Sequence, residues 1–414
     1  MKIDKKWIFL ICTLVYGSIL HAQSGNLDYY LKQGLENSPL LKDYRNQMSA
    51  NLVDSEKIKA IYKPQINANS TNSYAPVING WGYDEAITNG KNINAVLGFT
   101  QTLVSKKTLQ TQFESVNLLN KGLDNTSKIS EQDLKRTITA QYITTYGDEE
   151  QVNFLKETYQ LLKEEDEVLK KLTRSNVYRQ TDYLIFLVTL QQQELATAQA
   201  DIQLQNDFAT LNYICGTNDT SVLQLEKPAL ITENTPSAEN SVFFTQYAID
   251  SLSLINQKAV VDMNYRPKIN LFGDVGYNST LLVTPYKNIG YSFGVSLNIP
   301  IYDGGQRKLD YRKLAIAEET RTQYKDFFRR QYDQQLAQLQ QQLHATQNMI
   351  EQINHQIKYA NGLIKANTKL LATGDAKIAD LVIAINNYLT ARNLLTQNKV
   401  SSLLIVNQMN YWNH

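Results

Sequence analysis

The feature that most constrains the fold is a long stretch without helix breakers. No glycine or proline occurs between Gly305 and Gly362, and no proline follows Pro300. Apolar residues recur there at alternating steps of three and four, which is the pattern of a coiled-coil seam. The seam consists of Leu336, Leu339, Leu343, Thr346, Ile350, Ile353, Ile357, Ala360, Ile364, Asn367 and Leu371. The pattern predicts one helix over residues 304–372, about 100 Å long at 1.5 Å per residue.

The segment before this helix alternates between apolar and polar residues, as a β-strand with one apolar face does. Similar alternation predicts four strands, at residues 64–75, 92–104, 267–279 and 289–301. Their length is typical of transmembrane β-strands, whose lipid face is apolar and whose lumen face is polar. A half-buried sheet of a soluble protein alternates in the same way.

Tyrosines near the strand ends favour the membrane interpretation. Aromatic girdles at the two lipid interfaces of a barrel have this placement. Tyr62, Tyr265 and Tyr302 lie at one end of the predicted strands, and Tyr74, Tyr277 and Tyr291 lie at the other.

The chain is an internal duplication. The segment KPQIN at 63–67 reappears as RPKIN at 266–270, and TDYL at 181–184 corresponds to ADLV at 379–382. We expect a first repeat over residues 23–215, with helices at 105–172 and 180–214, and a second over 241–414, with helices at 304–372 and 380–412. Residues 216–240, rich in turn-forming residue types, would be the connector. The fold class is therefore mainly α, with two strands in each repeat.

The N-terminus predicts export. Lys2, Lys5 and Lys6 precede an apolar run at residues 7–20, and Ala22 stands at the expected cleavage point. This arrangement is that of a signal peptide, residues 1–22. The run is shorter than the roughly 20 residues of a membrane-spanning helix. A net charge of +1 gives no reason to expect a nucleic-acid partner.

No constellation of catalytic residues is found in the sequence. HExxH and CxxC motifs are absent. His344 and His355 would lie about 16 Å apart along one helix, too far to share a metal ion. We interpret the acidic cluster Asp148-Glu149-Glu150 as a solvated helix face. The chain is therefore not expected to be an enzyme or to hold a cofactor or metal.

If the strands span a membrane, the chain must oligomerise. Four strands cannot close on themselves, and each unpaired backbone group in lipid costs several kcal/mol. The backbone requirement alone therefore implies a barrel shared between chains.

The repeat, the element GVSLNIPIYDGG at 294–305 and a turn followed by Asp in each half resemble the TolC-like outer-membrane efflux family, over residues 25–412. The resemblance implies a homotrimer in outer-membrane lipid, with a twelve-stranded β-barrel continued by a coiled-coil α-barrel into the periplasm. Such a protein would be the exit duct for small molecules, with a periplasmic adaptor and an inner-membrane pump of RND or ABC type. The alternatives are the duct of a type I protein secretion system and a secreted structural or adhesive coiled-coil protein.

The resemblance also implies roles for the turns between the long helices. Asp380 and Asp182 correspond to the entrance constriction, while Ile383 stands where a relative has a second Asp. The adaptor-contacting turns would be Arg174, Ser175, Asn176, Val177, Thr373, Gly374, Asp375 and Ala376. Asn and Gly tolerate left-handed backbone most readily. From sequence alone, Asp182 and Asp380 also fit helix N-caps, because each follows a turn and precedes an apolar-periodic helix.

The strand-to-helix junction comprises Pro300, Tyr302, Asp303, Gly304 and Gly305. It lacks the spacing of a phosphate-binding loop, and its counterpart in the first repeat, VSKK at 104–107, has no glycine. We expect Pro300 to end the strand pairing, Tyr302 to lie at the lipid interface and the two glycines to permit the change of direction.

Overall fold

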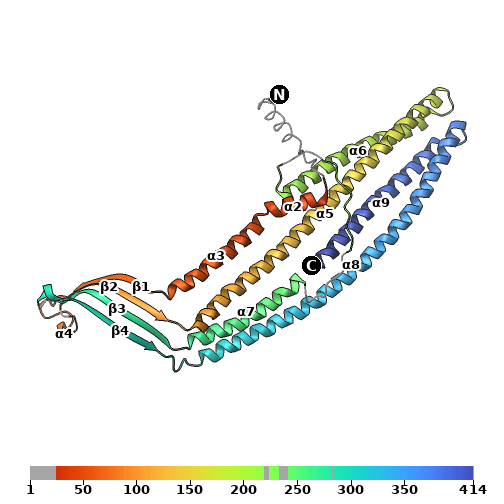
Figure 1. The fold of residues 1–414 in the computed structure, drawn as a ribbon. Coiled ribbons are helices and arrows are strands. Elements are labelled where there is room, and N and C mark those ends of the chain that lie inside the picture. The colour runs from red at the N-terminus through yellow and green to blue at the C-terminus, as the bar shows by residue number, and fades with distance from the viewer. Residues whose placement is uncertain (1–24, 89, 219–222, 233–240, 282–283, 414) are drawn as a thin grey trace, which may run out of the picture. The chain divides into compact units, whose positions relative to one another are not determined.

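The structure is a computed structural model that describes residues 25–88, 90–218, 223–232, 241–281 and 284–413. The expected signal peptide and much of the expected connector lie outside these residues. Each repeat contains a helical entry, two strands, a very long helix and a returning helix (Figure 1). The expected fold class, mainly α with two strands in each repeat, is confirmed.

The first repeat runs through six main elements and one short helix. They are α2 (Leu27–Asn37), α3 (Pro39–Ile61), β1 (Gln65–Tyr74), α4 (Glu85–Thr88), β2 (Lys91–Leu103), α5 (Lys106–Arg174) and α6 (Gln180–Cys215). The second repeat follows the same order. Its elements are α7 (Val242–Asn264), β3 (Lys268–Ser279), the 3₁₀ turn η2 (Pro285–Lys287), β4 (Ile289–Asn298), α8 (Gln306–Thr373) and α9 (Ile378–Trp412).

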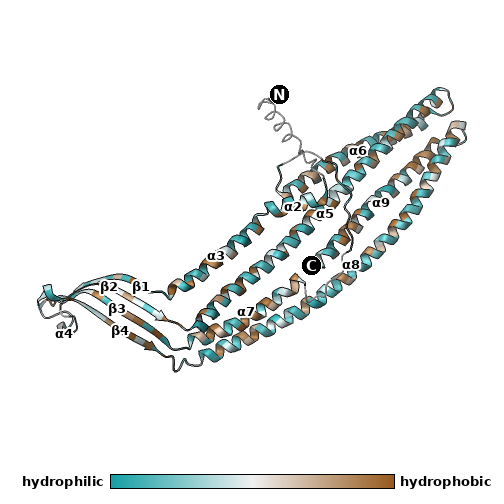
Figure 2. Cartoon of the chain, in the orientation of Figure 1, coloured by the Kyte–Doolittle hydropathy of each residue, from teal (hydrophilic) through white to brown (hydrophobic). Residues whose placement is uncertain are grey.

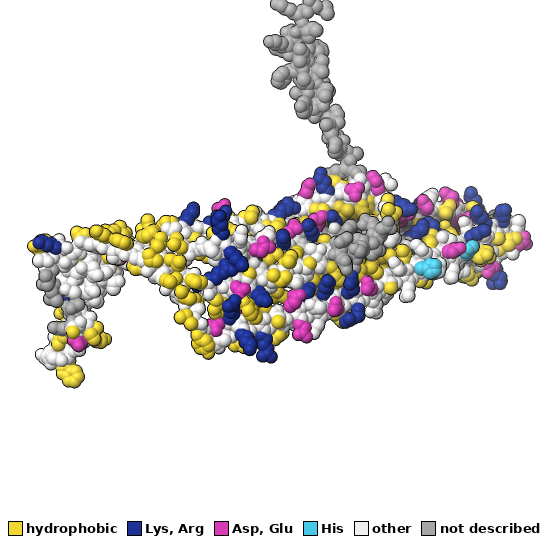
Figure 3. All heavy atoms as spheres, turned by 60° about the horizontal axis from the view of Figure 1, so that its bottom comes forward, with side chains coloured by type: hydrophobic (Ala, Val, Ile, Leu, Met, Phe, Trp, Pro, Cys, Tyr) yellow, Lys and Arg dark blue, Asp and Glu magenta, His cyan; other side chains and the backbone are white. Residues whose placement is uncertain are grey.

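The long helices α5 and α8 contain no proline, so no backbone donor is missing along them. Figure 3 shows side chains of both charge signs interspersed over the helices. No described helix combines the length and the apolar character that crossing a membrane would require.

The strands form one antiparallel sheet in the order β1-β2-β3-β4. The central pair, β2 with β3, joins the two repeats, with Leu103 opposite Ile269. Because side chains alternate across a strand, the registers place all the apolar alternating positions on the same face. One row across the sheet is Ile66, Phe99, Gly273 and Phe293. Figure 2 shows hydrophobic positions, in brown, recurring along the strands.

The chain divides into two compact units, and each contains parts of both repeats. One unit comprises Met1–Leu41, Lys128–Ser241 and Arg329–His414, and the other comprises Lys42–Ser127 and Val242–Phe328. The sheet belongs entirely to the second unit. The compact units therefore do not coincide with the sequence repeats, since α5 and α8 each contribute to both units.

Two buried clusters hold the first unit together. One surrounds the fully buried Tyr142 of α5, and the Cys215 thiol at the end of α6 is buried in it. The Tyr142 hydroxyl lies 2.7 Å from the Gly25 carbonyl oxygen and 2.6 Å from that of Glu226, to which it donates. This hydrogen bond ties the segment after α6 to α5. The second cluster lies at the turns between the long helices.

Candidate functional site

The sheet has one apolar and one polar face, and the apolar face is widely exposed. Phe293, Val295 and Leu297 of β4 are 84%, 66% and 60% exposed. The opposite face is polar, with Asn67, Asn69, Thr71, Asn94, Thr100, Asn270, Asp274, Ser292 and Ser296. Within the described chain, β1 and β4 each pair on one side only, so both edges of the sheet are open.

Phe272 is an aromatic residue on the otherwise polar face. The alternation of apolar residues in the sequence did not predict it there. It lies opposite Gly294 of β4, and a Cβ added to Gly294 would lie 2.5 Å from the Phe272 ring. The ring therefore covers a glycine, which is a known way to pin the register of neighbouring strands. In the sequence, only Gly294 indicated that the polar face has room for an aromatic ring.

The six predicted girdle tyrosines fall into two groups. Tyr74, Tyr291 and Tyr302 are 76%, 80% and 87% exposed, and Tyr277 lies opposite Ile289 on the apolar face. Two others contact protein groups instead. Tyr62 accepts a hydrogen bond from Gln112 at 2.9 Å, and the Tyr265 hydroxyl is hydrogen-bonded to Asp303. The girdle role of all six stays a prediction.

Asp303 caps α8. Its carboxylate accepts hydrogen bonds from the backbone N–H of Gly305 and of Arg307, both at 2.8 Å. These bonds, with that from Tyr265, hold the pKa of the Asp303 carboxyl below its usual value. Gly304 and Gly305 have φ of 68° and 88°, which glycine adopts without strain. The N-terminus of α8, where a phosphate would bind, therefore already holds a carboxylate.

Arg307 ties the start of α8 to the end of α7. It donates to Asp262 at 2.5 Å, and its guanidinium carbon lies 5.4 Å from the Tyr265 ring centroid. Tyr311 also donates to Asp262. Hydrogen bonds from Tyr311 and Arg307 keep the pKa of Asp262 below its usual range. The pairing of β3 with β4 ends at Asn298, two residues before Pro300.

At the strand-to-helix junction of the first repeat, a side chain also caps the long helix, although no glycine is present there. Ser105 precedes α5 and accepts a hydrogen bond from the Thr108 backbone N–H at 3.2 Å. Arg266, at the end of the other repeat's entry helix, donates to the Thr108 hydroxyl at 3.4 Å. Short polar side chains cap both long helices at the junctions.

The turns between the long helices have left-handed residues where Asn and Gly stand. Asn176 has φ of 58° and Gly374 has φ of 79°. The following N–H groups bond back to the helix, from Val177 to the Leu172 carbonyl oxygen at 3.0 Å and from Asp375 to that of Leu370 at 2.9 Å. This is the hydrogen bond of a Schellman-type helix end.

Tyr178 joins the two turns, a role that the sequence did not predict. Its hydroxyl lies 2.8 Å from the Leu371 carbonyl oxygen and 3.1 Å from that of Ala376, to which it donates. Phe186 of α6 and Leu381 of α9 are fully buried beneath the turns. The predicted tips of the two repeats therefore form one packed element.

The N-cap interpretation of Asp182 and Asp380 is wrong. The N-caps are Arg179 and Lys377, and neither makes a side-chain capping bond. Both aspartates lie inside the first helical turn, where a carboxylate complements the helix dipole. α6 begins at Gln180, as predicted, and α9 begins at Ile378, two residues before the predicted start at 380.

Near Asp380 the surface is partly apolar. Ile383, one turn further along α9, is 59% exposed. Asn367 of α8 donates to the Asp380 carbonyl oxygen at 3.3 Å, which fixes the backbone at this point and leaves the carboxylate exposed. The entrance roles of both aspartates and the adaptor contacts of the turns stay predictions.

The acidic cluster of α5 was expected to be a solvated helix face, and this prediction is wrong for Asp148 and Glu149. Asp148 and Glu149 are half-buried. Burial, then a hydrogen bond with Asp207 of α6, raises the pKa of Asp148 to about 7. Glu149 accepts a hydrogen bond from the Leu225 backbone N–H at 3.0 Å, and burial raises its pKa. The partners of both residues are distant in sequence, so local pattern could not identify them.

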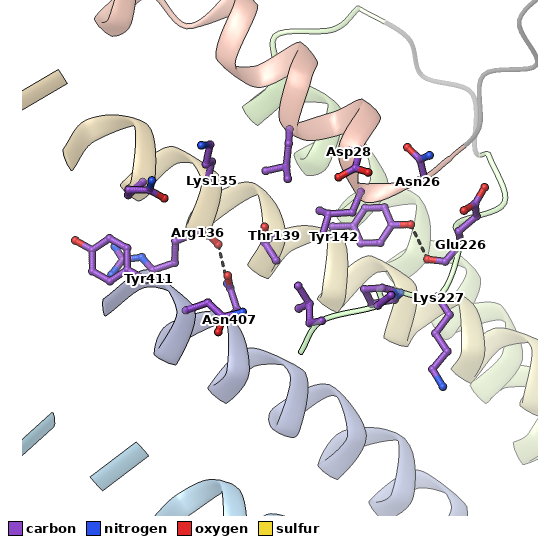
Figure 4. Close-up of a pocket in the computed structure, with 17 residues that line it drawn as sticks. Asn26, Asp28, Lys135, Arg136, Thr139, Tyr142, Glu226, Lys227, Asn407 and Tyr411 are labelled. Carbon is purple, nitrogen blue, oxygen red and sulfur yellow. Dashed lines mark hydrogen bonds between the residues drawn. The ribbon is translucent and has the colours of Figure 1, made fainter. Parts of the chain in front are cut away.

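A cavity of about 530 Å³ opens between α2, α5 and the end of α9 (Figure 4). The Arg136 guanidinium carbon lies 4.2 Å from the Tyr411 ring centroid, and Asn407 donates to the Arg136 carbonyl oxygen at 2.9 Å. Two of the cavity's three basic groups have acidic partners, Arg136 with Asp133 at 3.2 Å and Lys135 with Glu131 at 2.6 Å, and the third basic group is Lys227. The described residues contain no group of three His, Cys, Asp or Glu that could hold a metal.

Comparison with solved structures identifies the fold. The outer membrane protein VceC from Vibrio cholerae matches with a TM-score of 0.72 and 13% identity, over 94% of this chain and 96% of that chain. CusC, in structures that concern transmembrane channel formation, matches with a TM-score of 0.75 and 11% identity, over 94% of this chain and 92% of the CusC chain. The open state of the Neisseria gonorrhoeae MtrE outer membrane channel matches with a TM-score of 0.71 and 13% identity, over 94% and 88%.

No protein-family model and no curated protein sequence matches the chain. The likeness is therefore one of structure, over nearly the whole length of both chains. It confirms at the level of the fold the resemblance that the repeat and the junction motif predicted. The chain has the TolC-like fold of bacterial outer-membrane channels.

Proposed function

We propose that the chain forms a homotrimeric outer-membrane duct that passively conducts small molecules out of the periplasm. The observation that carries the proposal is the four-stranded sheet, with both edges open and one apolar face exposed. Similarity to proteins described as outer membrane channels supports it.

The open edges argue for closure between copies. An exposed strand edge presents unpaired N–H and C=O groups, which cannot remain unpaired in lipid. β1 of one copy would pair with β4 of the next, so that three copies give twelve strands. The apolar face would then contact lipid, and the face with Asn94, Thr100 and Asp274 would line the lumen.

Exposed aliphatic residues on α6 also favour contact with a second copy of the chain. Leu184, Val188, Leu195 and Ile202 are 51%, 57%, 64% and 60% exposed. Burial of apolar surface contributes roughly 25 cal/mol per Å². The helices of adjacent copies would cover these side chains and so assemble a helical tunnel.

The entrance of this tunnel would lie at the packed turns. Three copies of Asp380 near one axis would repel one another when ionised, so any motion that separates them relieves the repulsion. The same charges would favour cations. The turns around Asn176 and Gly374 would contact a periplasmic adaptor, and an inner-membrane pump of RND or ABC type would supply the energy.

The test is to purify the chain in detergent, measure its native mass and record single channels in planar bilayers. We expect a mass of three chains and a cation-preferring conductance, with the preference reduced in Asp380→Ala. Asp375→Ala, an exposed turn residue, is the matched control. Recovery as a monomer or dimer from buffer without detergent would contradict the duct. An unchanged preference in Asp380→Ala would contradict only the entrance assignment.

A further inference from the structure

A second cavity, of about 490 Å³, lies in the first compact unit between α5, α8 and α9. Gly147 of α5 brings its helix close to α9, because a Cβ added there would lie 2.4 Å from the Val400 Cγ2. Lys227, from the segment after α6, also lines the cavity. Three separate helices and one connecting segment thus converge on it.

The charge of this cavity is predominantly positive. Lys227, Arg392 and Lys399 line it, and Glu150 is the one carboxylate among its described lining residues. Arg392 and Lys399 lie two helical turns apart, on one face of α9. The Tyr146 hydroxyl is hydrogen-bonded to Glu150, so the carboxylate already has a partner.

Arg392 is held in place with one donor unused. Its guanidinium carbon lies 4.8 Å from the Phe154 ring centroid, a cation–π contact that favours this position of the group. Its Nε is buried, and no described residue accepts a hydrogen bond from it. A buried donor without an acceptor is unfavourable, so the described chain does not fully satisfy the Arg392 guanidinium.

The cavity of Figure 4, which Lys227 also lines, is a partial contrast within the same unit. There, Lys135 and Arg136 each form an ion pair with a neighbouring carboxylate. In the part of the chain that the structure describes, neither Lys227, Arg392 nor Lys399 takes part in an ion pair. Glu150, which is bonded to Tyr146, is therefore the one carboxylate in the described lining that offsets the three positive charges.

We propose that this cavity binds a phosphate group carried by a small molecule or a lipid. Three cations against one carboxylate match a phosphate monoester, whose charge is about −1.5 to −2 at pH 7. The Arg392 guanidinium donates to a phosphate oxygen through its terminal N–H groups, and Lys227 and Lys399 supply point charges. The Thr396 and Ser402 side chains, which also line the cavity, offer further donors. The proposal does not depend on transport activity.

The experiment uses the full chain in neutral detergent at low ionic strength. Isothermal titration calorimetry measures binding of inorganic phosphate in one arm and of short-chain phosphatidic acid in the other, with the matching phosphatidylcholine as the lipid control. We expect phosphate or phosphatidic acid to bind, and Arg392→Met to weaken the binding at least tenfold. Lys365→Gln, an exposed lysine of α8 outside the described cavities, is the charge control and should bind as the wild type does.

Lys227→Gln is the second variant, because Lys227 is exposed and lies outside the helices, so its loss does not disturb their packing. We expect several-fold weaker binding from it. Binding of phosphatidic acid alone would identify a lipid headgroup as the source, and binding of inorganic phosphate would identify a free anion. The proposal is overturned if neither probe binds, or if Arg392→Met and Lys227→Gln both bind as tightly as Lys365→Gln.

Discussion

Asp148 of α5 and Asp207 of α6 share a hydrogen bond between their carboxyl groups. Gln141 and Gln203 donate to the Asp207 carboxylate at 3.0 and 2.6 Å, so Asp207 is the acceptor and Asp148 holds the proton. These hydrogen bonds lower the pKa of Asp207, whereas burial raises that of Asp148 to about 7. When Asp148 is protonated, as it increasingly is below pH 7, one shared proton therefore links the two helices.

The first prediction concerns pH. The folded state binds the Asp148 proton more tightly than the unfolded state, so its stabilising effect is complete below about pH 4 and is lost as pH rises through about 7. We expect the melting temperature of the wild type to fall between pH 5 and 8, measured by circular dichroism. Asp148→Asn keeps a donor for Asp207 but cannot titrate, so its profile should be flatter. Asp201→Asn, whose carboxylate pairs with Lys156 at 2.9 Å, should keep the wild-type slope. Equal slopes for all three proteins would rule out the shared proton.

The second prediction concerns the ring that covers Gly294. Gly294→Ala would force the Phe272 ring to move, since the new Cβ would lie 2.5 Å from it. Overpacking of this kind costs about 1–3 kcal/mol, measured as a lower urea midpoint. Gly290→Ala, on the same strand with open space around it, should be near neutral. The double variant Phe272→Ala/Gly294→Ala should lose less than the sum of the single variants. Strict additivity would show that the ring does not press on Gly294.

The third prediction concerns the two turns. Tyr178→Phe removes a hydroxyl that bonds to backbone carbonyls of the other turn, worth about 1 kcal/mol. We expect faster amide exchange at residues 173–178 and 371–377, measured by mass spectrometry. Tyr213→Phe, at a site that is 84% exposed, is the control. Exchange that rises in one turn only would show that Tyr178 does not couple the turns.

The fourth prediction concerns the start of α8. Asp303→Ala removes an acceptor for two backbone N–H groups and should cost about 0.5–2 kcal/mol of helix stability. The readout is amide exchange in the first turn of α8. Asp303→Ser should retain part of the effect, and Asp310→Ala, an exposed carboxylate further along the helix, should not change it. Protection that survives in Asp303→Ala would mean that the two glycines alone start the helix.

Local periodicity was sufficient for the elements themselves. The step of three and four residues predicted α8, because a helix repeats its face every 3.6 residues. Strict alternation predicted β4, because a strand repeats its face every two residues. The left-handed backbone at Asn176 and Gly374 followed from residue type, since few other residues adopt it without strain. These properties depend on neighbours in the chain, which the sequence displays directly.

Only the tertiary structure decided what depends on distant partners. The hydrogen bond between Asp148 and Asp207 joins two helices, and Tyr178 joins the turns of two repeats. Phe272 lies on the polar face because Gly294 leaves room for its ring. The sequence alone determined the strands, the long helices and their duplication. Packing decided which charges are buried and which side chains join the repeats, because these are set by contacts between residues far apart in the chain.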